Sequence, residues 1–236
     1  MRGVKRYLVY LLLVVFMVGC SSRASEEFSE FPLYKGTIWV YTYQAYEPSG
    51  SSVDSVVKAT YQLTETVMDV GSNAPYPIAH VKKEFKLENA DAGWTGDFTS
   101  NQNNEIWDVV DGEKIYSSNQ PIDINSINVD EINLAYDFPL SVHKTWCPIQ
   151  VDLKDPNHKP IPNCRFSGQR EVTGQGSFEN AAGKFKDCYD LTDYFNSGNI
   201  FQKFCVGIGV VSMKFDHMGT PFGFEQTLIR YSIGKP

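Results

Sequence analysis

Apolar and polar residues alternate through most of this chain, and this period of two residues constrains its fold more than any other feature. Within residues 79–88, for example, Ala79, Val81, Phe85 and Leu87 alternate with charged residues and one histidine. Successive side chains of a β-strand point to opposite faces of a sheet, so the pattern predicts strands with one face in the core and one in solvent. The same alternation recurs at residues 39–45, 57–67, 185–195, 200–215 and 224–231.

Helical periodicity is missing beyond residue 19. No window of 12 or more residues there carries an apolar stripe that repeats every 3.6 residues. We therefore predict an all-β protein built of antiparallel meanders.

One short motif occurs twice. Phe31-Pro-Leu followed by Trp39 recurs as Phe138-Pro-Leu followed by Trp146, at identical spacing, and β-rich runs follow each copy in a similar order. We interpret this as an internal duplication with halves 31–137 and 138–236 inside a single β domain, residues 31–236. Two such meanders would form one strongly curved sheet, a half-barrel or a sandwich. In each motif the proline sets the direction of the chain, and we expect the Phe and Leu side chains to close the open end of the core.

The N-terminus has the pattern of an export signal. Basic residues within Met1–Arg6 precede 12 uncharged residues, 7–18, and Gly19-Cys20 follows. A membrane-spanning helix needs roughly 20 apolar residues, so a retained transmembrane anchor is the weaker alternative. We predict a signal peptide over residues 1–19.

The segment Met17-Val18-Gly19-Cys20 resembles the lipobox of bacterial lipoproteins. The resemblance implies that the cut falls before Cys20, that Cys20 carries the lipid, and that the protein is held on a membrane outside the cytoplasm. Residues 20–30 would then be a lipidated tether, since they are polar and acidic without a period. Ser21 after the cysteine indicates the outer membrane if the host has one. The alternative is that Cys20 is an ordinary residue of a discarded signal peptide.

The charge of the chain excludes one class of partner. It has 21 basic and 28 acidic residues, and loss of the signal peptide removes three basic ones, which changes the net charge from −7 to −10. Such a protein is repelled by nucleic acid, so we expect no nucleic-acid partner.

Four cysteines remain after the cut: Cys147, Cys164, Cys188 and Cys205. An even count in an oxidising compartment indicates disulfides, and four cysteines allow three pairings. The turn-like residues 194–199 predict a hairpin that places Cys188 opposite or nearly opposite Cys205. We favour Cys147 with Cys164 and Cys188 with Cys205, each 17 residues apart. A four-cysteine metal site is the alternative, but the chain has no C-x-x-C spacing.

Three segments resemble a group of uncharacterised bacterial secreted proteins and lipoproteins. Residues 31–43 (FPLYKGTIWVYTY) are similar to their F-P-L-x-x-G-x-x-W-x-Y opening, residues 183–191 (GKFKDCYDL) to their G-x-F-x-x-C block, and residues 204–215 (FCVGIGVVSMKF) to their closing G-V-G-L-V-K segment. The resemblance implies a β-rich exported domain and supplies no activity or catalytic residue. The second copy of the motif has His143 and Lys144 where a glycine is expected, which leaves room for a different turn.

Candidate catalytic and metal-binding residues form no recognisable motif in the sequence. The four histidines, His80, His143, His158 and His217, show no metal-ligand spacing, and the common hydrolase, metalloprotease and phosphate-loop signatures are absent. Residues 123–131 are rich in oxygen ligands, but a solvated connector is favoured over a calcium loop. We therefore predict no catalytic residue, no metal and no cofactor.

The tryptophans are expected to divide by environment. Trp39 and Trp146 lie in strand patterns and should be core residues. Trp94, between glycines, is the candidate for an exposed aromatic contact.

Three functions are compatible with these features. The favoured one is a non-enzymatic envelope module that binds a protein or glycan partner or has a structural role. The alternative is a periplasmic carrier of lipid or lipoprotein, which would need an unfilled cavity lined with Phe, Tyr and Val on an apolar concave sheet. A hydrolase with an unusual site ranks third, and would need carboxylates clustered in a cleft.

Overall fold

The computed structural model describes residues 30–49, 52–71, 76–96, 104–122, 132–148, 164 and 167–235. The predicted signal peptide, Cys20, the oxygen-rich segment 123–131 and His158 lie outside these residues, so what the sequence predicts for them stays a prediction.

Twelve strands form one antiparallel sheet, and the described residues contain no helix. The first six are β1 (Ile38–Ser49), β2 (Ser52–Gly71), β3 (Ile78–Ala90), β4 (Glu105–Asp111), β5 (Lys114–Ser118) and β6 (Asn133–Asp137). The last six are β7 (Thr145–Trp146), β8 (Ser167–Asn180), β9 (Gly183–Phe195), β10 (Gly198–Cys205), β11 (Gly209–His217) and β12 (Gly223–Ser232). Each half is a meander, and the two meanders join through β1 and β12. The all-β prediction is confirmed.

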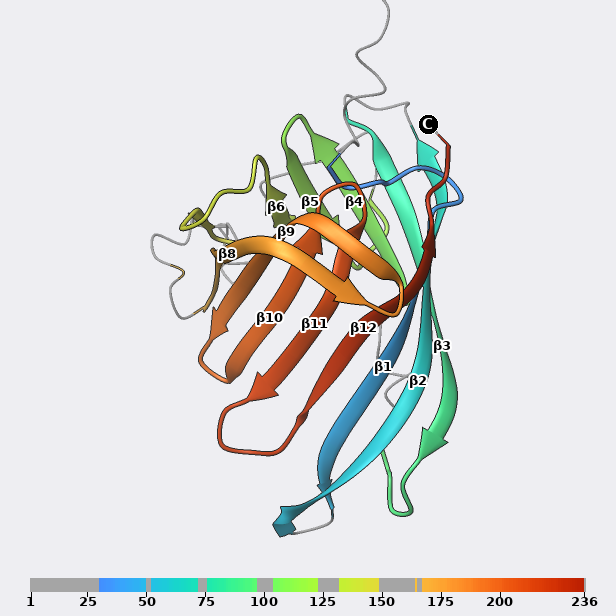
Figure 1. Cartoon of the computed structure of the whole chain (residues 1–236), viewed down its shortest axis with the longest axis vertical. Coiled ribbons are helices and arrows are strands. Elements are labelled where there is room, and N and C mark those ends of the chain that lie inside the picture. The colour runs from blue at the N-terminus through green and yellow to red at the C-terminus, as the bar shows by residue number, and fades with distance from the viewer. Residues whose placement is uncertain are drawn as a thin grey trace, which may run out of the picture.

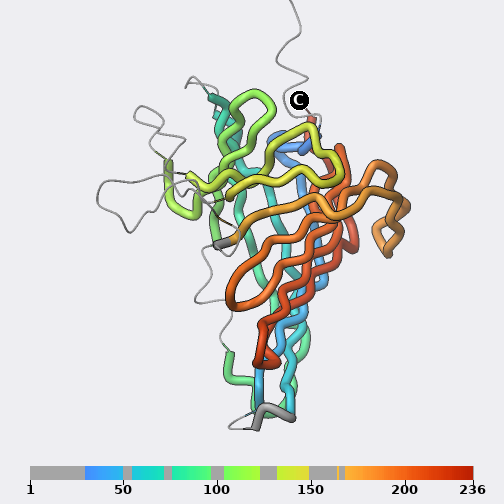
Figure 2. Tube along the Cα trace, turned by 90° about the vertical axis from the view of Figure 1, so that its left-hand side faces the viewer, coloured from blue at the N-terminus to red at the C-terminus, as the bar shows by residue number. Residues whose placement is uncertain are grey.

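The sheet curves so strongly that its two ends meet (Figure 1). At this seam the main-chain N–H of Leu134 in β6 donates to the carbonyl of Pro148, just after β7, at 2.7 Å. The indole of Trp146 donates to the carbonyl of Leu134 at 3.2 Å. The fold is therefore one curved sheet around its own core, rather than two packed sheets. Figure 2 shows that β1, β2 and β3 continue past most of the other strands at one end.

The two copies of the repeated motif adopt the same turn. Gly36 has φ 83° and His143 has φ 71°, and in both turns the next residue donates to the carbonyl three residues before it, at 2.9 Å. The different turn that the sequence allowed in the second copy is not found. Histidine is tolerated in this left-handed region, although glycine adopts it at less cost.

Both turns also pair with the next long strand in the same way. Residues 36 and 37 exchange two main-chain hydrogen bonds with Val67 of β2, both 2.9 Å, and residues 143 and 144 exchange two with Val172 of β8, at 2.8 and 2.9 Å. The duplication stays a prediction, and this shared geometry supports it.

The phenylalanines of the two motifs pack against the same rings. Phe31 lies 5.5 Å from Tyr136 and 5.7 Å from Phe204, and Phe138 lies 5.8 and 5.6 Å from the same two rings. The two motifs therefore cover one region of the core together.

The end of the β8–β9 hairpin bends over the outer face of β10–β12 (Figure 1). The amide of Asn180 donates to the carbonyl of Val211 at 3.4 Å, and Phe185 contacts Tyr231 with ring centroids 6.0 Å apart. Two of the three register shifts between β8 and β9, after Val172 and after Gly176, permit the bend. The hairpin covers part of the outer face that a simple one-sided sheet would leave in solvent.

Candidate functional site: an interior cavity

The concave face of the sheet encloses a cavity of about 360 Å³. Ten of the twelve strands, together with the segment around Phe31 and Leu33, contribute to its wall. Its volume lies within the ~300–1,000 Å³ typical of small-molecule sites. A larger hollow of about 760 Å³ lies beside the β9–β10 turn, where Tyr194 donates to Glu171 at 3.2 Å, but no buried polar atom without a partner lines it.

One side of the cavity is aromatic. Tyr43 stacks on Phe224 with ring centroids 5.2 Å apart and meets the edge of Phe85 at 5.4 Å. Trp39 also lines the cavity, and its indole N–H donates to the carbonyl of Ile208 at 2.6 Å. With Val81 and Val210 these rings give the Phe, Tyr and Val lining expected of a carrier, but polar and charged residues line the same cavity.

Charged side chains lie beside these aromatic residues in the cavity wall. Glu65 of β2 lies directly opposite Trp39 of β1 and Lys83 of β3 in the sheet, so all three side chains share the inner face. The Lys83 ammonium pairs with the Glu65 carboxylate at 3.1 Å, and both side chains are less than one-quarter exposed. An apolar strand pattern thus contains an ion pair that points into the cavity.

Asp108 of β4 is the most perturbed acid of the cavity wall. It is 6% exposed and accepts a hydrogen bond from the hydroxyl of Ser117, its neighbour on β5. Burial raises the pKa of this carboxyl to about 6, although the Ser117 hydrogen bond and the charge of Lys83 act in the opposite direction. Among the described residues it has no ion-pair partner.

Arg170 of β8 lines the cavity and forms a buried ion pair with Asp193 on the neighbouring strand β9. Its guanidinium makes two hydrogen bonds to the carboxylate of Asp193 on β9, at 2.5 and 2.6 Å, and donates to the carbonyl of Ala135 on β6, at 2.5 Å. It also lies over the ring of Tyr136, 5.5 Å from the centroid. The Arg170 side chain therefore connects β8 with β9 and, across the seam of the sheet, with β6.

Gln202 of β10 leaves a buried acceptor unused. The residue is 7% exposed, and its amide nitrogen donates to the hydroxyl of Tyr136 at 2.7 Å. Its amide oxygen accepts no hydrogen bond from any described residue. An unsatisfied buried acceptor costs about 1–3 kcal/mol, so a ligand that donates to it gains that energy.

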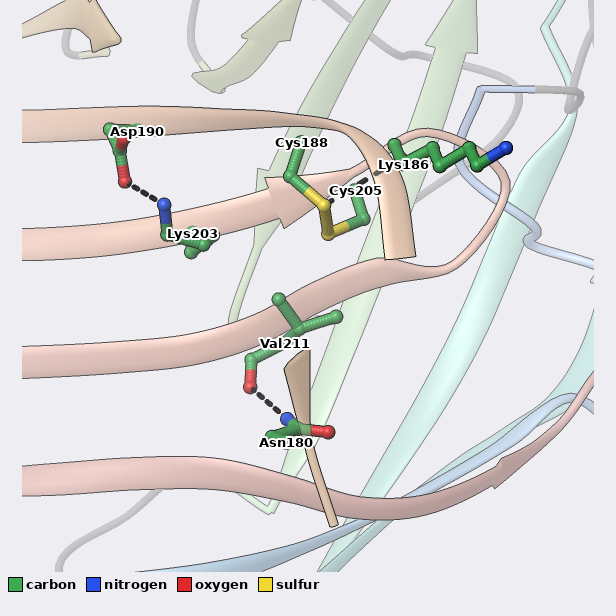
Figure 3. Close-up of a disulfide and its surroundings, with 7 residues drawn as sticks. All are labelled: Asn180, Lys186, Cys188, Asp190, Lys203, Cys205 and Val211. Atoms are coloured by element: carbon green, nitrogen blue, oxygen red, sulfur yellow. Dashed lines mark hydrogen bonds and ion pairs between the residues drawn. A yellow bond between two sulfur atoms is a disulfide. The ribbon is translucent and has the colours of Figure 1, made fainter. Parts of the chain in front are cut away.

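The cysteines lie away from this cavity. Two disulfides are present, Cys147–Cys164 with Cα atoms 5.7 Å apart and Cys188–Cys205 with Cα atoms 4.0 Å apart. The second joins directly opposite residues of β9 and β10, next to the bend of β9 (Figure 3). Their role is therefore structural.

Trp94 is half-buried rather than open to solvent. Its ring packs against the core, and its indole nitrogen is covered without a hydrogen-bond partner. The main-chain N–H groups of Thr95 and Gly96 donate to the carboxylate of Glu47, at 3.0 and 3.2 Å, and hold this loop against β1. A contact role for Trp94 stays a prediction. Trp39 and Trp146 are 2% and 7% exposed, which confirms that they are core residues.

The described part of the chain contains no group of three or more His, Cys, Asp or Glu residues that could hold a metal ion. Within the same residues there is also no helix with the length and hydropathy needed to cross a bilayer.

None of the polar residues in the cavity wall is among the site residues predicted from the sequence. A signal for two of them is visible afterwards: Glu65 and Lys83 occupy inward positions in two runs of alternating apolar residues, 57–67 and 79–87. Asp108, Arg170 and Gln202 lie in less regular runs, where the sequence does not show which face is the inner one.

No protein-family model matches this chain, and no curated protein matches it. Three solved structures share a distant likeness. A Bacteroides fragilis protein described as exported, with a YmcC-like fold, is 13% identical, with a TM-score of 0.45 over 86% of this chain and 98% of its own. A Parabacteroides distasonis protein described as a lipoprotein is 14% identical, with a TM-score of 0.43 over 86% and 97%. A DUF1329 family protein from Desulfovibrio piger is 10% identical, with a TM-score of 0.27 over 91% of both chains. At these identities and TM-scores, the likenesses assign no function to this chain.

Proposed function

We propose that this chain is a lipid-anchored envelope protein that binds a small molecule inside its curved sheet without transforming it. The observation that carries the proposal is the 360 Å³ cavity, which combines an aromatic side with a buried, unsatisfied amide oxygen on Gln202. Binding pockets commonly join an apolar wall to a few placed polar groups in this way.

The anchor part of the proposal rests on the N-terminus. The export pattern of residues 1–19 and the lipobox-like residues before Cys20 support lipidation of Cys20, with residues 20–30 as a tether to the β domain. Replacement of Cys20 by Ser should release the exported protein from the membrane fraction and abolish acyl labelling. A variant that still fractionates with membranes would contradict the anchor.

The arrangement of carboxylates favours binding over hydrolysis. Glycoside hydrolysis, for instance, uses two free carboxyl groups on either side of the scissile bond. In the cavity wall Glu65 is paired with Lys83, which leaves Asp108 as the one unpaired carboxyl among the described lining residues. A single carboxyl can bind and orient a ligand, but it does not complete that catalytic pair.

A carrier of lipid or lipoprotein is the second candidate, because the aromatic rings Tyr43, Phe85 and Phe224 offer an acyl chain an apolar surface. Against it, an acyl chain that filled the cavity would lie on Asp108 and on the Glu65–Lys83 pair, and desolvation of charged groups without compensating partners is costly. A molecule with both polar and apolar parts fits the cavity better.

The test is native mass spectrometry of the mature chain, residues 20–236 with Cys20→Ser, exported and purified without detergent and followed by solvent extraction. A stoichiometric small molecule is the expected result. A diacyl lipid in its place would select the carrier. An empty protein in both measurements, even after incubation with an extract of the host's envelope, would refute the proposal.

A further inference from the structure

Two hydrogen-bond acceptors in the cavity wall, the Asp108 carboxylate and the Gln202 amide oxygen, have few donors among the described residues. Asp108 reaches it from β4 and Gln202 from β10, and both lie near Tyr136: the hydroxyl of Tyr136 accepts from Gln202, and the charge of Asp108 acts on the pKa of Tyr136. The carboxylate has one hydroxyl as its hydrogen-bond partner among the described residues, and the amide oxygen has none.

The cations of the wall are already paired. The Lys83 ammonium lies 3.1 Å from Glu65, and the Arg170 guanidinium makes two hydrogen bonds to Asp193. With Asp108 ionised, Asp108 and the two ion pairs together carry three negative and two positive charges. A positive charge from the ligand would therefore neutralise the cavity wall, whereas a negative one would increase the imbalance.

The aromatic residues of the cavity also favour a positively charged ligand. Rings attract a cation over their faces, by about 0.5–1 kcal/mol at exposed sites and more where water is excluded. Tyr43, Phe85 and Phe224 form an aromatic surface in the cavity, and the apolar part of a ligand can also pack against it. The volume of about 360 Å³ lies near the lower end of the ~300–1,000 Å³ typical of small-molecule sites, so the ligand is compact.

We infer that the cavity binds an organic ammonium ion with a compact apolar body, its N–H groups donating to Asp108 and Gln202 and its body lying on the aromatic rings. This inference rests on the proposed function, and it specifies the ligand class for the same site.

Three probes with the same phenyl body and different head groups test it: phenethylamine, phenethyl alcohol and phenylpropionate. Binding to the mature chain is measured by calorimetry and by tryptophan fluorescence, since Trp39 lines the cavity. We expect the amine to bind at least about tenfold more tightly than the alcohol or the acid, because it alone can pair with a buried carboxylate.

Asp108→Asn removes the charge and keeps an amide oxygen in place. It should weaken amine binding at least about tenfold and change alcohol binding less than about twofold. The matched control is Asp69→Asn, since Asp69 is an exposed partner of Lys35 with 68% of its side chain accessible, and it should leave all three affinities unchanged. Urea unfolding of each variant confirms that it is folded.

The pH dependence provides a second readout. Glu65 on β2 and Lys83 on β3 act electrostatically on Asp108, whose own charge acts on Tyr136 of β6, and burial raises the Asp108 pKa to about 6. An alkylammonium stays charged far above this range, as lysine does. Amine affinity should therefore fall between pH 7.5 and pH 5, and this dependence should disappear in Asp108→Asn.

Other outcomes separate the inference from the proposed function. Equal binding of amine and alcohol, or preference for the acid, would refute the ammonium ligand while leaving a binding cavity in place. If no probe binds, the molecule extracted from the protein decides: a cation supports the inference and a neutral or anionic molecule overturns it. An empty cavity overturns both proposals together.

Discussion

Removal of the positive partner from the Arg170–Asp193 pair should destabilise the protein strongly. The side chains of Arg170 and Asp193 are 13% and 6% exposed, so Arg170→Met leaves a carboxylate buried without its partner. Loss of one partner of a buried pair typically costs about 3–5 kcal/mol. The same substitution also removes the hydrogen bond to the carbonyl of Ala135, which crosses the seam of the sheet. For a domain of this size that loss lowers the melting temperature by roughly 10 °C or more.

The assay is urea unfolding followed by tryptophan fluorescence and circular dichroism, with the disulfides intact. The double variant Arg170→Met/Asp193→Leu should recover most of the lost stability, because it leaves no unpaired charge. Lys184→Met is the matched control, since its pair with Glu179 is 79% and 64% exposed and should contribute at most about 0.5 kcal/mol. A loss below about 1 kcal/mol in Arg170→Met, or no recovery in the double variant, would refute the assigned role of this pair.

Three further predictions concern stability. Burial raises the pKa of Asp108 from 3.8 to about 6 in the folded protein, so its ionisation destabilises the folded state above pH 6 and has no effect below about pH 4. Asp108→Asn should therefore raise the free energy of unfolding at pH 7.5 by on the order of 2–3 kcal/mol and leave it unchanged at pH 4. An equal change at both pH values in urea titrations would contradict this. Replacement of Cys188 and Cys205 together by Ala should cost about 3 kcal/mol, because the disulfide closes a short loop, and a calorimetric scan of the oxidised variants measures it. Gly198→Ala should lower the free energy of unfolding by more than about 2 kcal/mol, since its Cβ would lie 2.2 Å from a carbonyl oxygen of β11. Gly176→Ala should lower it far less, because a Cβ there would have nothing within 4 Å. Similar losses of stability in the two variants would argue against the steric cause.

The strands were the most predictable part of this protein. Alternation at residues 39–45, 57–67 and 79–88 falls within β1, β2 and β3, and the buried positions of Trp39 and Trp146 follow from the same pattern. Side-chain period is a local property of a strand, so it can be predicted without the partners of that strand. The bend of the β8–β9 hairpin was missed, because it depends on register shifts and on contacts with β11 and β12.

The polar wall of the cavity could not be predicted in the same way. Glu65 and Lys83 look like ordinary surface residues until the curvature of the sheet places them on the inner face beside Trp39. The amide of Gln202 meets the hydroxyl of Tyr136, 66 residues earlier in the chain, because the sheet wraps back on itself. No local pattern carries that information.

By itself the sequence determined the β class, the position of several strands and the export pattern before Cys20, since each depends on residues close together in the chain. The tertiary structure alone decided that one sheet closes on itself, that Arg170 on β8 reaches the carbonyl of Ala135 on β6, and that Asp108 and Gln202 line one cavity. The physical reason is that curvature and strand pairing join residues far apart in the sequence, and the burial of a polar group depends on every strand around it.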